Sequence, residues 1–290
     1  MKEPTELSSR DPNSGLFRAD QPVPLSDYLR ELWHRRDFLT RVPIEDLKTE
    51  NVHMLLGGLW LLLNPILQVA VYFLVFGPLG LRTGRGVDQF LVFLTIGVFV
   101  FLFTQRTVTE VARAVVVNMG LVRTIRFPRA ALPISYTIGQ IFSFFPTLVV
   151  MLVIVLAYGN WPTIRWLLIP LAFLLQIMFS LGAGLFVARF NHTYRDLESI
   201  LPFVFRLLFY VSGVLYSVDS LLGDRQLGEV WHMIFLANPM YCFVTLWRWA
   251  LIGTHVTLEV WLASLAWSTI SLAVGLVVFR SKEVSYGTTG

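Results

Sequence analysis

Side chains able to carry out acid–base, nucleophilic or metal chemistry are few in this 290-residue chain and do not group. The five histidines are scattered without the spacing of metal ligands, and no HExxH, GxSxG or glycine-rich phosphate motif occurs. The single cysteine, Cys242, excludes an intramolecular disulfide and a CxxC motif. We therefore expect that the chain is not an enzyme and holds no metal or cofactor of its own.

Arg206 is the clearest charge inside an apolar stretch, and Arg106 also falls within one. A lone arginine at that depth costs at least about 2.5–3.5 kcal/mol on insertion scales, so Arg206 should face a protein interior or water. Two interpretations stay open for Arg206. It contacts a substrate, or it has a structural partner such as a main-chain carbonyl.

The composition is that of a membrane protein. Hydrophobic residues make up 55% of the chain and charged residues 14%, against about 45–50% and about 25% in soluble domains. The net charge of +4 does not indicate nucleic-acid binding, because the arginines flank apolar stretches.

Six stretches are long enough to cross a bilayer as helices, which takes about 20 apolar residues. We therefore predict an all-α polytopic fold with six transmembrane helices per protomer. The predicted spans are 55–79, 90–110, 132–157, 166–188, 200–217 and 259–279.

Positive charge predicts the orientation. With the N-terminus inside, the cytoplasmic regions hold sixteen lysines and arginines and the outer regions hold five. We expect a multi-pass protein of the cytoplasmic (inner) membrane, surrounded by lipid, with both termini in the cytoplasm.

The termini lie outside the predicted spans. Residues 1–24 predict a flexible cytoplasmic tail, and 280–290 a short C-terminal one. Residues 25–54 predict an amphipathic interface region, because apolar residues including Trp33 recur there at helical spacing among arginines. The alternative is a helix packed on a soluble partner.

The outer segment 218–258 contains two short apolar pieces, 230–237 and 240–252, separated by Asn238 and Pro239. Each is too short to span, which favours an external re-entrant helical hairpin. Trp231, Tyr241, Trp247 and Trp249 suit the headgroup boundary. A loop lying in the interface is the alternative.

The inner segment 111–131 predicts a cytoplasmic amphipathic helix. Val108, Val111, Val115 and Met119 form one helical stripe, and Pro128 stops the helix before the next span. Such a helix could transmit motion from a soluble partner. A basic loop that follows the positive-inside rule would explain the arginines alone.

Several of these segments resemble one known family. The run from Asn118 to Pro133, with Phe127-Pro128-Arg129 inside it, resembles the first coupling-helix region of ABC-2 type permeases, more closely those that export polysaccharides such as O-antigen and teichoic acid. The stretches 58–65, 194–197 and 238–253 are similar to further segments of that family, and all four occur in the family's order.

The resemblance implies a half-transporter. Residues 55–279 would form the ABC-2 transmembrane domain, which works as a homodimer with two copies of a separate ATP-binding subunit that holds ATP and Mg. No Walker A motif occurs in this chain. The residues expected to contact that subunit are Trp33, Arg36, Arg113, Asn118, Arg123, Arg126, Tyr194, Arg195 and Asp196.

The same resemblance implies a transport path lined by the first and fifth spans. Aromatic rings suit a sugar polymer because they stack on sugar faces without one fixed hydrogen-bond pattern. The alternative for each ring is ordinary packing against lipid or another helix. The path candidates are Trp60, Tyr72, Phe73, Phe76, Arg206, Phe209, Tyr210 and Tyr216.

The implied cargo is a lipid-linked polysaccharide. The polar tail before Ser26 and the preference for arginine over lysine differ from O-antigen exporters and favour a cell-wall galactan of an actinobacterium. A Gram-negative O-antigen stays open. Rival functions are an ABC-2 exporter of a drug or small lipid, a multi-span enzyme acting on a lipid-linked glycan, and a membrane scaffold.

Overall fold

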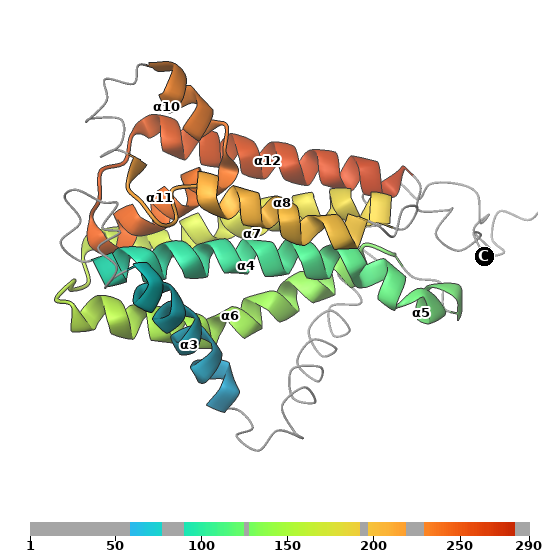
Figure 1. Cartoon of the computed structure of the whole chain (residues 1–290). Helices are drawn as coiled ribbons and strands as arrows, with labels where there is room; N and C mark the ends of the chain where they lie inside the picture. Colours follow the sequence, from blue (N-terminus) through green and yellow to red (C-terminus); the bar gives the residue numbers. More distant parts are fainter. Residues whose placement is uncertain (1–58, 77–89, 125–127, 192–196, 219–228, 282–290) are drawn as a thin grey trace, which may run out of the picture.

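The computed structural model describes residues 59–76, 90–124, 128–191, 197–218 and 229–281. All regular elements in these ranges are helical, which confirms the predicted all-α class for the described part (Figure 1). They are α3 (Trp60–Phe76), α4 (Phe90–Val117), α5 (Met119–Thr124), α6 (Ala131–Ala157), the 3-10 helix η2 (Ile164–Leu168), α7 (Ile169–Asn191), α8 (Leu197–Val211), α10 (Glu229–Leu236), α11 (Pro239–Ile252) and α12 (Leu258–Arg280).

Four helical stretches are long and apolar enough to cross a membrane: Phe90–Val117, Ala131–Ala157, Ile164–Asn191 and Leu258–Arg280. They correspond to four of the six predicted spans. The other two predicted spans contain α3 and α8, which have 17 and 15 residues and are shorter than the usual 20. The predicted first span extends beyond the described residues at both ends.

The predicted fifth span, 200–217, is wrong in its bounds. Helix α8 starts at Leu197 and ends at Val211. Gly213 has a φ of 66°, a left-handed conformation with which an α-helix cannot continue. The apolar stretch therefore bends where the sequence pattern suggests an unbroken helix.

Helix α4 forms the centre of the bundle. It contacts α3, α6, α7, α8 and α11, and Figure 1 shows it between α6 on one side and α7 and α8 on the other. Its side chains are buried on all faces from Val92 to Phe101. A helix that is apolar all round belongs in a core, as this one does.

Helices α7 and α12 make the closest helix pair. A Cβ on Gly182 would collide with the backbone of Ser271 and Leu272, and one on Gly275 with the backbone of Gly182. The Ser268 hydroxyl donates across the pair to the Leu175 carbonyl at 2.7 Å. Small residues that let two backbones approach are typical of helix pairs in membranes.

The predicted cytoplasmic helix in 111–131 is not one separate helix. Val108, Val111 and Val115 continue α4 and are buried in the bundle. The break comes at Asn118, whose amide donates to the Ala114 carbonyl at 2.8 Å and to the Tyr136 hydroxyl at 3.0 Å. Only the short α5 follows as a separate helix.

Candidate functional site

Aromatic rings from α3, α4 and α8 meet in one group. Tyr72 stacks on Phe209 with ring centroids 5.3 Å apart and an interplanar angle of 28°. Phe209 meets Phe101 edge to face at 5.1 Å and Tyr210 at 5.7 Å, and Phe101 meets Phe205 at 6.2 Å. These five residues are called the aromatic seam below. Three of them, Tyr72, Phe209 and Tyr210, are predicted path candidates.

The two members outside the predicted set, Phe101 and Phe205, are buried. Phe205 lies four residues before Phe209, so helical spacing could have placed both on one face. Phe101 gives no such signal because α4 is apolar on every face.

The exposure of the predicted path residues differs widely. Phe209 is 6% exposed and Tyr210 is 57% exposed. Trp60, Phe76 and Tyr216 are half-buried, and the Tyr216 hydroxyl donates to the Val211 carbonyl at 3.4 Å. The structure thus brings together only part of the predicted path set.

Arg206 lies on the exposed side of α8, outside the aromatic seam. Its guanidinium carbon is 5.8 Å from the ring centroid of Phe203, within the range of a cation–π contact. Leu201, Phe205 and Phe209 form the buried face of the same helix. Arg206 therefore points away from the face that α8 packs against its neighbours.

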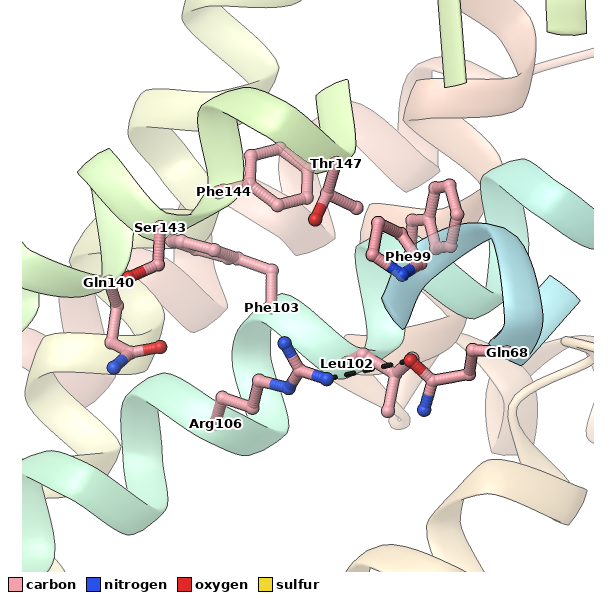
Figure 2. A pocket seen from close by; sticks show the side chains of 10 residues that line it. Gln68, Phe99, Leu102, Phe103, Arg106, Gln140, Ser143, Phe144 and Thr147 are labelled. Carbon is pink, nitrogen blue, oxygen red and sulfur yellow. Dashed lines mark hydrogen bonds between the residues drawn. The ribbon is translucent and has the colours of Figure 1, made fainter. Parts of the chain in front are cut away.

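A pocket lies between α3, α4 and α6 (Figure 2). Arg106 of α4 projects into it and donates to the Gln68 side-chain oxygen of α3 at 3.5 Å. Gln140 and Ser143 of α6 line the opposite side. Sequence reasoning assigned Arg106 to a span and gave it no role, because the facing residues Gln68 and Gln140 come from two other helices.

Two helices occur where the external hairpin is predicted. Asn238 caps α11 by accepting from the backbone N–H groups of Met240 and Tyr241, and Pro239 occupies the first helical turn. The helix ends at Gly253, which has a φ of 72°. Trp231 of α10 is 47% exposed. Entry of these helices into the outer leaflet stays a prediction.

Tyr241 and Trp247, whose ring types suit the headgroup boundary, lie inside the bundle rather than on its surface. Both are buried, because α11 packs against α4, α7 and α12. The Trp247 indole donates to the Gln176 side-chain oxygen at 2.9 Å. Gln176 in turn donates to the Val100 carbonyl and the Thr104 hydroxyl, each at 2.8 Å. No sequence signal singles out Gln176, which is one amide in an apolar stretch.

Arg248 of α11 is 5% exposed, and its guanidinium binds main-chain carbonyls of α4 and of the bend after α8. It donates to the carbonyls of Val214 at 2.7 Å, Gly213 at 2.8 Å and Phe93 at 3.1 Å. Its guanidinium carbon also lies 3.3 Å from the Phe93 ring centroid. Arg248 thus satisfies the carbonyls freed by the bend after α8 and fixes that bend to α4.

The predicted contacts with a soluble subunit are described only in part. Arg113 makes a two-pronged ion pair with Glu110 at 2.6 and 2.9 Å, and Asn118 forms the break after α4. The backbone of Arg123 lies in α5. Trp33, Arg36, Arg126, Tyr194, Arg195 and Asp196 lie outside the described residues. In the ranges that the structure describes, no three histidine, cysteine or acidic side chains gather to hold a metal ion.

Comparison with known proteins identifies the family. The model of the ABC-2 type transporter family matches residues 53–252, more than half of the chain. The O-antigen export system permease protein RfbA of Myxococcus xanthus is 28% identical over 260 residues, which cover 89% of this chain and 97% of that protein. RfbA of Klebsiella pneumoniae is 27% identical over 86% of this chain and 93% of its own length. The polysialic acid transport protein KpsM of Escherichia coli is 25% identical over 83% of this chain and 91% of its own length. The helices, the buried bundle and this match over most of the chain place the protein in the ABC-2 type transporter family.

Proposed function

We propose that this chain is the permease subunit of an ATP-driven exporter that moves a lipid-linked polysaccharide across the cytoplasmic membrane. The single observation that carries the proposal is the family match together with relatives named for O-antigen export and polysialic acid transport, aligned over 83–89% of this chain. The family model covers residues 53–252, which include the bend after α8 and the helices of the outer segment.

The arrangement of the aromatic seam supports a sugar polymer as cargo. Tyr72 and Phe209 stack across α3 and α8, and the neighbouring Tyr210 is open at 57% exposure. An exposed ring offers a flat face on which sugars bind in several equivalent positions, and Tyr210 is the ring of the seam that is open in this way, since Phe101, Phe205 and Phe209 are buried. A drug or small-lipid exporter would need no such polymer-tolerant surface.

The proposal includes six spans, with α3 and α8 as the cores of the first and fifth, and both termini in the cytoplasm. Residues 1–24 would form a free tail, 25–54 an interface region, 55–279 the transmembrane domain and 280–290 a second tail. Helices α10 and α11 would enter the outer leaflet as a re-entrant hairpin. Cysteine accessibility at residues in 80–89 and 158–165, compared with 192–196, tests this orientation.

Two copies of this chain would assemble with two separate ATP-binding subunits, as the family resemblance implies. The chain contains no Walker A motif of its own, and two of its relatives are named as permeases of export systems. Native mass spectrometry of the chain co-expressed with the ATP-binding protein encoded nearest to it tests the assembly. A 2:2 complex with ATP turnover is expected. A chain that binds no ATPase would contradict the proposal and favour an enzyme or a scaffold.

The cytoplasmic contacts have their own test. The double variant Arg126→Glu with Asp196→Arg is expected to lower ATPase binding or coupled export while the purified chain keeps its elution profile. These residues touch no sugar, so an effect on export must come through coupling between sites. Unchanged ATPase activity and unchanged export would refute the assignment of these contacts.

More specifically, we propose that the exported polysaccharide is a cell-wall galactan. Its support is limited to the polar tail before Ser26 and the preference for arginine over lysine. The glycan that accumulates on the cytoplasmic side after depletion of this chain, identified by sugar analysis, distinguishes a galactan from an O-antigen or another polymer.

A further inference from the structure

An apolar rim lies at the end of the bundle where α6 ends and where α7 and α12 begin (Figure 1). Residues 158–168 form the link from α6 to α7, including η2, and Arg165 is the one charged residue among them. The side chains called the rim below are 45–80% exposed and are those of Tyr158, Trp161, Ile164, Leu167 and Leu258. An exposed apolar patch of this kind marks contact with a membrane or with another protein.

The lengths of two helical stretches place the rim at the boundary of the membrane. The stretch Ile164–Asn191 has 28 residues and would be about 42 Å long, and Leu258–Arg280 has 23 residues and would be about 35 Å long. The hydrocarbon core of a bilayer is about 30 Å thick, and the bilayer with its headgroups about 40–45 Å. The first residues of both stretches therefore reach headgroup depth when the stretches span the membrane. Tryptophan and tyrosine are enriched at that depth.

Arg165, the cation beside the rim, is positioned by the end of α11. Its guanidinium carbon lies 6.0 Å from the ring centroid of Trp249, within the range of a cation–π contact. That ring meets Trp261 of α12 edge to face, with centroids 5.6 Å apart. A Cβ on Gly253 would collide with the Arg165 guanidinium, so the guanidinium also lies against the backbone at the end of α11. Side chains of η2, α11 and α12 thus hold one cation in place.

The charge of Arg165 is not matched by a carboxylate within the described ranges. The acidic side chain in the first turn of α12, Glu259, contacts His232 of α10 at 3.3 Å instead. Arg165 is exposed, so its N–H donors are open to an anion from outside the bundle. A guanidinium carries five donors in a planar fork that matches the oxygens of a phosphate. At headgroup depth, the phosphate of a lipid is the anion within reach.

Apolar side chains continue from Arg165 toward the interior of the membrane. Leu168 follows three residues after Arg165, on the same face of the 3-10 helix, and is 37% exposed. Leu171 and Leu174 of α7 come next and are 44% and 52% exposed. A ligand with both a phosphate and an acyl chain would contact the guanidinium and these leucines, whereas a free phosphate would contact only the guanidinium.

We propose that the rim lies in the headgroup layer of the membrane and that Arg165 binds the phosphate of an anionic phospholipid there, with one acyl chain along Leu168 and Leu171. The bound lipid fixes the depth of α7 and α12, which begin beside it and form the closest helix pair of the bundle. The inference rests on the membrane location that the family shares and not on the exported cargo.

Fluorescence quenching in liposomes tests the inference on the full-length chain. Thr163→Cys, at an exposed residue just before Arg165, carries a bimane label. The liposomes are phosphatidylcholine with the same low mole fraction of brominated phosphatidylglycerol or brominated phosphatidylcholine. We expect both brominated lipids to quench the label, with a preference of about fivefold for phosphatidylglycerol, the effect of one basic residue at an anionic lipid surface. The natural cysteine, Cys242, is buried, and the unsubstituted chain measures its background labelling.

The arginine and the position of the label each have a matched control. Arg165→Gln should remove the preference for phosphatidylglycerol and leave the quenching by phosphatidylcholine unchanged. Arg165→Lys should keep part of the preference, because it keeps the charge but not the fork. A label on Val149→Cys, at an exposed residue within α6, should show no preference in either background. Each variant is first checked for an unchanged elution profile and unfolding midpoint.

The outcomes decide the two parts of the inference separately. A preference for phosphatidylglycerol that depends on Arg165 supports both parts. A label at residue 163 that neither brominated lipid quenches overturns the position of the rim in the membrane. Equal preference with Arg165 and with Arg165→Gln overturns the headgroup site. A preference that inorganic phosphate removes, but sodium chloride at the same ionic strength does not, would assign the guanidinium to a free anion and overturn the lipid.

Failure here is distinguishable from failure of the proposed function, because the readouts differ. A chain that assembles with an ATPase and exports polysaccharide, yet shows no lipid preference through Arg165, would refute only the headgroup site. A chain that prefers phosphatidylglycerol through Arg165 but recruits no ATPase would refute only the exporter.

Discussion

The bundle has two regions held together in different ways. The frame, formed by α4, α7, α11 and α12, is joined through backbone contact at Gly182 and Gly275 and through buried polar bonds of Gln176 and Arg248. The aromatic side, formed by α3 and α8, meets the frame mainly through ring contacts, with one long hydrogen bond from Arg106 to Gln68, and leaves wide apolar faces exposed. Hydrogen bonds and close backbone contacts hold two helices in one geometry, whereas contacts between aromatic rings allow one helix to slide against another. In the proposed exporter, we therefore expect the frame to hold its shape and α3 and α8 to be the helices that adapt to a cargo or a second copy.

The largest expected effect comes from Gly182→Ala in the frame. The added methyl collides with the backbone of Ser271 and Leu272, which cannot move aside as a side chain can. We expect the α7–α12 pair to separate at a cost of about 3 kcal/mol or more, with loss of most monodisperse protein in size-exclusion chromatography. Gly120→Ala is the matched control, since its added Cβ meets no atom within 4 Å. Equal yields for the two variants would contradict a rigid frame.

Arg248→Met should have the second-largest effect on stability. It removes the donor to three main-chain carbonyls in a buried setting, which destabilises the fold by on the order of 3 kcal/mol. The measurement is the thermal unfolding midpoint in detergent, and Arg248→Lys should fall between Met and the wild type. Arg165→Met, at an exposed arginine of η2, should change the midpoint little. A small shift of the unfolding midpoint for Arg248→Met would mean that the bend at Gly213 does not depend on the hydrogen bonds from Arg248.

Gln176→Leu tests the polar network at the centre of the frame. It leaves the Trp247 indole without its acceptor and should destabilise the fold by about 2 kcal/mol. Combining it with Trp247→Phe removes the indole donor that has lost its acceptor. The double variant should therefore lose less unfolding free energy than the sum of the two single losses. Strict additivity of the unfolding midpoints would show that this hydrogen bond contributes nothing.

Tyr210→Ala should have the smallest effect on stability and a clear effect on transport. Tyr210 is 57% exposed, so its loss should change the unfolding free energy by about 0.5 kcal/mol or less. Export of the polysaccharide should fall several-fold, and Tyr210→Phe should keep most of it because the ring remains. Val211→Ala, at a neighbouring exposed apolar residue, is the control. Normal export by Tyr210→Ala would assign this ring to packing or lipid contact.

Much of the fold could be predicted from the sequence because long apolar stretches and helix-stopping residues are local signals. The all-helical class follows from them, and so does the division of the outer segment at Asn238 and Pro239. The family resemblance, carried by short motifs in a fixed order, is confirmed by the family match.

The burial of individual side chains could not be predicted in the same way. In a membrane, a residue that faces lipid and one that faces another helix are both apolar, so periodicity does not separate them. The 18-residue apolar window of α4 is 78% buried and that of α6 only 17%, although both helices read as apolar spans. For this reason the sequence pattern does not predict that Trp247 is buried among helices.

The sequence alone determined which segments are apolar enough to leave water, because that depends on the summed hydrophobicity of about 20 consecutive residues. It also determined the absence of a nucleotide-binding motif, which is a property of neighbouring residues. Only the tertiary structure decided the bend at Gly213, the carbonyls bound by Arg248 and the pocket that gathers Arg106, Gln68 and Gln140. The carbonyl contacts of Arg248 and the pocket join residues that are far apart in the chain, and their meeting depends on how the helices pack, which no local pattern contains.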